Sequence, residues 1–216
     1  MPPFPRPDYA SRNSQACTGV FVVTFITGLL VALPHGVGAT APRALPIFAA
    51  WDAPTIGFMC LYIEAFLAMV CLIGILFGDP GALKRSPSSC FPLPPSISDK
   101  LRAKQSLAHL DNIYTNGQIF CVRCCIWRPE SHGTRADATH HCSICQRCVV
   151  DFDHHCGVFG RCIAGKGWRG NMGYFKGILL LAILGLITSF ATTFSTAGDM
   201  IASPPPPSAL PTDGRG

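Results

Sequence analysis

The segment that most narrows the folds open to this chain runs from Cys121 to Cys162. It reads CVRCCIWRPESHGTRADATHHCSICQRCVVDFDHHCGVFGRC and holds eight of the twelve cysteines and five of the seven histidines. Thiolate and imidazole are the ligands of tetrahedral zinc, and a Cys-x-x-Cys turn presents two thiolates to one ion. The sequence therefore predicts a zinc-organised segment with enough ligands for two sites and some to spare.

Spacing selects the candidate ligands but does not divide them between ions. Three pairs have knuckle spacing: Cys121 with Cys124, Cys142 with Cys145, and Cys145 with Cys148. Three further residues can complete two tetrahedra: His141, His155 and Cys162. Cys125 can compete with Cys124. Structural zinc contributes on the order of 10 kcal/mol to folding, so the metals would serve as the core of a segment with few apolar residues.

The composition indicates a membrane protein. The chain is 49% hydrophobic and 13% charged, with a mean hydropathy of +0.33, which is too apolar for an ordinary soluble domain. Twelve cysteines could also indicate a secreted disulfide scaffold, but such scaffolds are small and rich in loops. Here the cysteines lie beside histidines, and long apolar runs flank them. Reduced, metal-bound cysteines facing the cytosol fit better.

Three uncharged or nearly uncharged runs predict transmembrane helices, at residues 17–33, 54–77 and 177–197. The first could instead be a signal peptide with Arg6 and Arg12 as its charged region and a cleavage site at residues 39–41. We favour a retained span, because the run starts late and is long for a signal core. Glu64 interrupts the second run, so we expect it to face a neighbouring helix, to be protonated, or to lie near an interface.

Charge predicts the orientation of the chain. Residues 78–176 carry thirteen of the seventeen Lys and Arg residues. The positive-inside rule therefore places a basic linker at 78–120 and the cysteine-rich domain at 121–175 in the cytosol, and the loop at 34–53 on the opposite side. Residues 1–16 and 198–216 are rich in proline and lack any period, so we expect disordered tails.

One cysteine is a candidate nucleophile. A zinc ion with four protein ligands has no open position, so any chemistry must come from a residue left unbound. Cys156 ends the run Asp153-His154-His155-Cys156. His154 can act as its base, and Asp153 can fix the tautomer of His154. In the alternative interpretation, all four residues are metal ligands or a polar turn.

These residues resemble the DHHC protein S-acyltransferases (palmitoyltransferases). The resemblance covers Asp79-Pro80-Gly81, the run HHCSICQRCVVDFDHHC that ends at Cys156, then Cys162, and Asn171 with Phe175. It implies a mainly α membrane protein with a cytosolic two-zinc domain between its second and third spans. It also implies two structural zinc sets: Cys121, Cys124, His141 and Cys148, and Cys142, Cys145, His155 and Cys162.

The resemblance implies an activity as well. Cys156 would be the nucleophile, His154 the general base and Asp153 its partner. In a ping-pong reaction, Cys156 would take the acyl group of palmitoyl-CoA or another long-chain acyl-CoA and pass it to cysteines of membrane-associated proteins. A cavity among the spans would hold the acyl chain. The expected partners are acyl-CoA, those substrate proteins and the lipid bilayer of the Golgi, the ER or the plasma membrane, with no nucleic acid.

The sequence departs from this family in five places. The spacing from Cys162 to Asn171 is longer than the family's. Sixteen residues separate Cys124 from His141, so residues 130–139 look like an insertion. The family's Pro-Trp-Val-Asn-Asn after the nucleophile is replaced by residues 157–161, GVFGR. Three spans are expected where the family usually has four. Thr192-Thr193 is not followed by the family's glutamate.

These departures leave alternatives open. The sequence can be part of a longer chain, or another subunit can complete its helix bundle. A catalytically inactive, membrane-anchored zinc module that binds partners is the competing function. A RING-like or LIM-like ubiquitin ligase fits poorly, because its usual ligand order leaves no Asp-His-His-Cys run within it.

Overall fold

The computed structural model describes residues 1–38, 53–129, 139–166 and 170–202. These residues form two units, Met1–Val22 with Cys71–Gly177 and Val23–Val70 with Ile178–Gly216. The helices of the described residues are α1 (Tyr9–Gly38), α2 (Ala53–Phe77), α3 (Pro87–Cys90), α4 (Pro95–Arg102) and α5 (Met172–Ala202). The strands are β1 (Ile113–Thr115), β2 (Gln118–Cys121), β3 (Ile126–Trp127), β4 (His140–Cys142), β5 (Arg147–Val149), β6 (Phe152–Cys156) and β7 (Arg161–Ala164).

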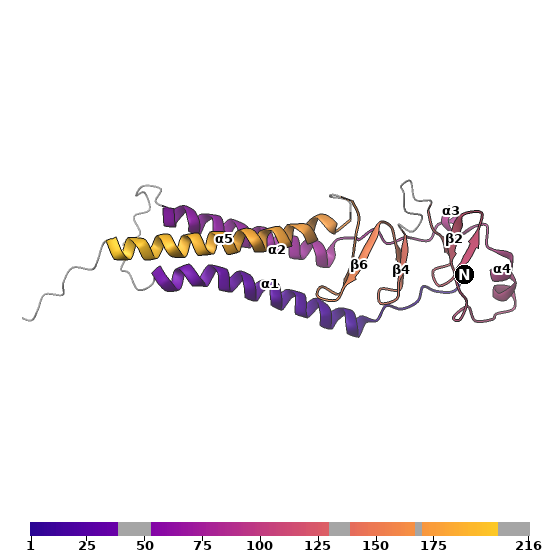
Figure 1. The fold of residues 1–216 in the computed structure, drawn as a ribbon. Coiled ribbons are helices and arrows are strands. Elements are labelled where there is room, and N and C mark those ends of the chain that lie inside the picture. Colours follow the sequence, from indigo (N-terminus) through magenta and orange to yellow (C-terminus); the bar gives the residue numbers. More distant parts are fainter. Residues whose placement is uncertain (39–52, 130–138, 167–169, 203–216) are drawn as a thin grey trace, which may run out of the picture. The chain divides into compact units, whose positions relative to one another are not determined.

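Three helices are long and apolar enough to cross a membrane: Tyr9–Gly38, Ala53–Phe77 and Met172–Gly198. They are the long ribbons α1, α2 and α5 of Figure 1. The three predicted spans are thereby confirmed as candidate membrane helices, although α1 extends beyond its predicted range at both ends. Pro34 lies inside α1, where the prediction ended the span. Membrane helices tolerate such prolines because other groups satisfy the freed backbone.

The second unit contains polar contacts between its helices. Thr188 Oγ1 donates to Glu64 Oε1 at 3.0 Å, and Ser189 Oγ donates to the carbonyl of Leu30 at 2.7 Å. Both bonds join helices that lie side by side in Figure 1. Glu64 therefore faces a neighbouring helix. This is one of the three placements expected from the free-energy cost of a carboxylate in an apolar segment.

The amino-terminal arm is ordered against the zinc-binding loops, so a disordered tail does not describe residues 1–16. The Phe4 ring lies between two guanidinium groups, with Cζ of Arg85 4.1 Å and Cζ of Arg147 4.2 Å from its centroid. Arg147 Nη1 also donates to the Pro5 carbonyl at 2.9 Å. Proline and a lone aromatic residue carry no periodic signal. The order of this arm comes from these cation–π and hydrogen-bond contacts with a distant segment.

The basic segment 78–120 contains helices and a hairpin rather than a plain linker. Ile97 of α4 is fully buried with Phe120, Val122 and Cys125 in one apolar cluster. The β1–β2 hairpin turns at Asn116 and Gly117, both with positive φ (50° and 77°), the backbone of a type I′ turn. Part of this segment therefore packs against the start of the cysteine-rich stretch.

The remaining strands form short antiparallel pairs, β4 with β5 and β6 with β7, while β3 extends the β1–β2 hairpin. No sheet was predicted, because strands of two to five residues carry too few positions for a visible alternation. The loop expected at 34–53, the insertion at 130–139 and the tail at 198–216 lie largely outside the described residues, although α5 continues to Ala202.

Candidate metal centres and catalytic site

Two Cys-x-x-Cys turns share one backbone conformation. The residue after the second cysteine has positive φ in both, 52° at Cys125 and 53° at Gln146. In the second turn, Gln146 N donates to the carbonyl of Cys142 at 2.8 Å. This conformation folds the chain back into the next strand and directs both thiols of each turn to one side. The local fold therefore prepares each pair to bind a single ion.

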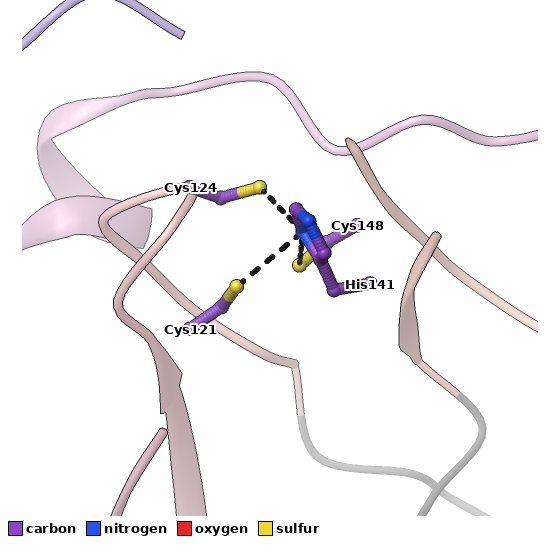
Figure 2. Close-up of side chains that lie close together, drawn as sticks. All are labelled: Cys121, Cys124, His141 and Cys148. Carbon is purple, nitrogen blue, oxygen red and sulfur yellow. Dashed lines mark hydrogen bonds between the residues drawn. The ribbon is translucent and has the colours of Figure 1, made fainter. Parts of the chain in front are cut away.

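The first cluster joins both hairpins. Cys121 and Cys124 come from the end of β2 and its turn, whereas His141 and Cys148 come from the paired strands β4 and β5. Figure 2 shows the three sulfur atoms around the imidazole of His141. His141 Nδ1 lies 3.6, 3.2 and 3.9 Å from the sulfur atoms of Cys121, Cys124 and Cys148. All four ligand atoms lie within 4.8 Å of one another, and all four residues are buried.

The second cluster is built in the same way from Cys142, Cys145, His155 and Cys162. His155 Nδ1 lies 3.5 Å from the sulfur atoms of both Cys142 and Cys145, and 3.9 Å from that of Cys162. In a tetrahedral zinc site, Zn–S and Zn–N bonds of about 2.3 and 2.0 Å give N···S separations of about 3.5 Å. Both Cys3His clusters therefore fit zinc, in the two sets that the family resemblance implies.

The charges of the first cluster suit a cation. Hydrogen bonds from Cys124 and Cys148 lower the pKa of Cys121, so its thiolate is favoured. Burial lowers the pKa of His141, but the hydrogen bonds that it donates to Cys121 and Cys124 outweigh burial and raise the pKa to about 9. Without metal, an imidazolium thus balances the thiolate charge. With zinc bound, the ion supplies that positive charge and holds four chain segments together.

Cys125 does not compete for the first site. Its thiol donates to the carbonyl of Val122 at 3.4 Å and lies in the apolar cluster with Ile97 and Phe120. Burial raises the pKa of this thiol, which disfavours the thiolate that zinc requires. Because Cys125 follows the turn, its side chain leaves on the side away from the metal ligands.

The β6–β7 hairpin separates metal ligands from the candidate catalytic residues. His155 pairs directly with Cys162 across the hairpin, and both belong to the second cluster. Side chains alternate between the faces of a strand, so His154 and Cys156 lie together on the other face of β6. Cys156 belongs to neither cluster among the described residues. Cys156 is buried, with 8% of its surface exposed, so its thiol is shielded from bulk water.

The candidate base is oriented by its neighbour. Asp153 lies at a register shift between Phe152 and His154, where the extra residue bends β6. Its Oδ2 lies 2.7 Å from Nδ1 of His154, and the His154 ring packs edge-on against Phe175 at 5.3 Å. A proton held on Nδ1 by the carboxylate leaves Nε2 unprotonated in the neutral ring.

Other residues that carry the family resemblance stabilise the hairpins. The Asn171 side chain is fully buried, accepts from Ala164 N at 3.0 Å and donates to the Cys162 carbonyl at 2.8 Å. Asp79 Oδ1 accepts from the backbone of Gly81 and Ala82, which ends α2 in a turn. Residue Ala82 then bridges to Val149 of β5. These residues position the metal clusters.

Sequence reasoning missed three side chains near the site. Gln15 Oε1 lies 3.0 Å from His155 Nε2, Arg12 donates to the Gly160 carbonyl at 3.5 Å, and Arg161 donates to the same carbonyl at 3.1 Å. Arg161 also donates to the Leu76 carbonyl. Gln15 and Arg12 lie outside any motif. The sequence could have indicated them only through their three-residue spacing, which places both on one face of a helix.

Comparison with known proteins agrees with this geometry. Residues 114–204 match a family model described as DHHC palmitoyltransferase. The chain is 30% identical over 126 residues to the protein named Palmitoyltransferase Hip14 of Drosophila melanogaster. That alignment covers 58% of this chain and 16% of the relative, so the chain spans only a small part of that protein.

Proposed function

Since residues 114–204 belong to the DHHC palmitoyltransferase family, we propose that this chain transfers long-chain acyl groups from acyl-CoA to cysteines of membrane-associated proteins. The observation that carries the proposal is the two-faced β6–β7 hairpin. Through His155 it would hold a structural metal on one face, and it presents Cys156 and His154 on the other.

In the first half-reaction, His154 Nε2 takes the proton of the Cys156 thiol. The thiolate attacks the carbonyl carbon of the acyl-CoA thioester, and the bond between that carbon and the CoA sulfur breaks. CoA leaves as a thiolate and takes the proton from the His154 imidazolium. Asp153 stabilises that imidazolium through the 2.7 Å contact with Nδ1. General-base assistance of this kind contributes roughly 10²- to 10⁴-fold in rate.

In the second half-reaction, the thiol of a substrate cysteine gives its proton to His154 and attacks the Cys156 thioester. The new thioester forms as the bond to the Cys156 sulfur breaks, and Cys156 recovers the proton. The free enzyme is regenerated without an oxidant or reductant. Zinc, when bound, supplies no open coordination position here, since each cluster offers four protein ligands.

A membrane location follows from the donor as well as from the helices. Each buried methylene of an acyl chain contributes about 0.8 kcal/mol, so a long-chain acyl-CoA concentrates at a bilayer. Three apolar helices would anchor the chain there. The thirteen basic residues in 78–176 support a cytosolic zinc domain. The Golgi, the ER or the plasma membrane is part of the proposal through the family resemblance alone.

The test is an intact-mass measurement of the purified full chain after incubation with palmitoyl-CoA. We expect one palmitoyl adduct that hydroxylamine removes, absent from Cys156→Ser and retained in Cys17→Ser, which alters an exposed thiol. Full labelling of Cys156→Ser would reject Cys156 as the nucleophile.

The altered residues 157–160 favour a second candidate, an inactive membrane-anchored zinc module. That function predicts a folded chain with two bound zinc ions per molecule and no adduct in lipid nanodiscs.

A further inference from the structure

Residues 157–160, which depart from the family sequence, are covered by the first turns of α1. A Cβ at Gly19 would lie 2.6 Å from Cδ1 of Phe159 and 2.8 Å from the Val158 carbonyl. A Cβ at Gly160 would collide with the carbonyl of Arg12, and Gly160 has φ of +62°. Each glycine therefore permits a close approach that any larger residue would prevent. The loop and this part of α1 fit each other.

Side chains reinforce this fit. Arg12 of α1 and Arg161 of β7 both donate to the Gly160 carbonyl. Arg161 directly follows Gly160 in the chain, whereas Arg12 belongs to the helix. Asp8 accepts from Ser11 N at 3.0 Å and so caps the start of α1. The helix is thus fixed at its first turn, directly before the residues that contact the loop.

Gln15 links the helix to the second metal cluster. Its Nε2 donates to Ser11 Oγ at 3.2 Å, which orients the amide so that Oε1 faces His155 Nε2 at 3.0 Å. His155 Nδ1 faces the three sulfur atoms, so Nε2 carries the proton that Gln15 accepts. By contrast, Nε2 of His141 in the first cluster is buried without a partner among the described residues.

We propose that Gln15 is a positioning residue for the second metal cluster and, through it, for Cys156. The imidazole of His155 is adjacent to Cys156 on β6, so fixing the ring plane also fixes the strand that carries the nucleophile. The effect of Gln15 on Cys156 rests on the proposed function. The effect of Gln15 on zinc retention does not depend on that function.

The experiment compares the full chain with Gln15→Met, Gln15→Glu and Asn13→Leu in lipid nanodiscs. Gln15→Met keeps the length of the side chain but removes the acceptor, Gln15→Glu keeps an acceptor, and Asn13 is exposed on the same turns of α1. Zinc release to a chromogenic chelator and palmitoyl labelling of Cys156 are followed in parallel. Far-UV circular dichroism verifies that each variant is folded.

We expect Gln15→Met to release one of its two zinc ions about 10- to 100-fold more readily, the usual effect of removing a partner of a ligating histidine. Gln15→Glu and Asn13→Leu should behave as the unaltered chain. Labelling of Cys156 should fall in Gln15→Met alone. Zinc release from Gln15→Met at the unaltered rate would overturn the inference, even if Cys156 is labelled. Absence of labelling in every chain, with the zinc effect present, would instead reject the proposed function and leave the positioning role standing.

Discussion

Asp153 Oδ2 lies 2.7 Å from His154 Nδ1, which makes the carboxylate the group that selects the tautomer of the candidate base. Asp153→Asn should therefore slow the formation of the Cys156 adduct, because the amide can present its donor face and favour the wrong tautomer. His154→Ala should reduce the rate by roughly 10²- to 10⁴-fold. Single-turnover labelling with palmitoyl-CoA measures both.

The control for this pair is Asp111→Asn, which removes an exposed carboxylate that lies just before β1, outside the candidate site. Equal rates for Asp153→Asn and the unaltered chain would remove Asp153 from the mechanism.

Zinc retention should weaken as the pH falls. The pKa of His141 is raised to about 9 in the metal-free protein, so below that pH a proton competes with zinc for the imidazole. The stability of the metal-free fold depends on pH in the opposite direction. Protonated His141 stabilises that fold fully below the unfolded pKa of about 6.5, and this stabilisation is lost as the pH rises through 9. Chelator competition between pH 6.5 and 9 should show tighter zinc binding at the higher pH. A flat profile would contradict the assignment of His141 as a ligand.

Removal of both metal ions should unfold the hairpins of the zinc domain while leaving the helices intact. The strands are short, and the ligand cysteines make up much of the buried apolar cluster around Cys121. A chelator such as phenanthroline should therefore expose residues 139–166 to protease, with little change in helical circular dichroism. Protection of this segment in the metal-free chain would show that apolar packing suffices for folding.

Cys125 should resist alkylation at neutral pH. Burial raises its pKa, so the reactive thiolate is scarcer at pH 7.5 than in an exposed cysteine. Iodoacetamide followed by peptide mass analysis should modify Cys125 only in alkali or after unfolding. Rapid modification of Cys125 at pH 7.5 would contradict its burial beside Phe120.

Two glycines of α1 provide a matched comparison of packing. Gly19→Ala should destabilise the chain by about 1–3 kcal/mol, because its methyl group would press on Phe159. Gly28→Ala has nothing within 4 Å of the added Cβ and should be neutral or slightly stabilising through helix propensity. Thermal unfolding in detergent distinguishes the two signs. A neutral Gly19→Ala would mean that the Phe159 side chain moves aside without cost.

The extent to which the sequence predicted this structure depended on the range of the interactions. Metal ligands and membrane spans have strong local signatures, so the apolar runs and the cysteine pairs were found directly. The Phe4 contacts with Arg85 and Arg147 and the Gln15 contact with His155 join segments more than 80 residues apart. No local pattern in the arm reveals them. The turn conformation that directs Cys125 away from the metal is likewise invisible in the letters CVRCC.

The register of β6 limits how this sequence can change. His155 and Cys156 point in opposite directions because they are consecutive residues of one strand. Inserting or deleting a single residue within β6 before them would exchange their orientations, so that Cys156 would face the second metal cluster and His155 would face away from it. The connections around this hairpin can therefore change in length, whereas an insertion or deletion inside β6 would displace a metal ligand and the candidate nucleophile together.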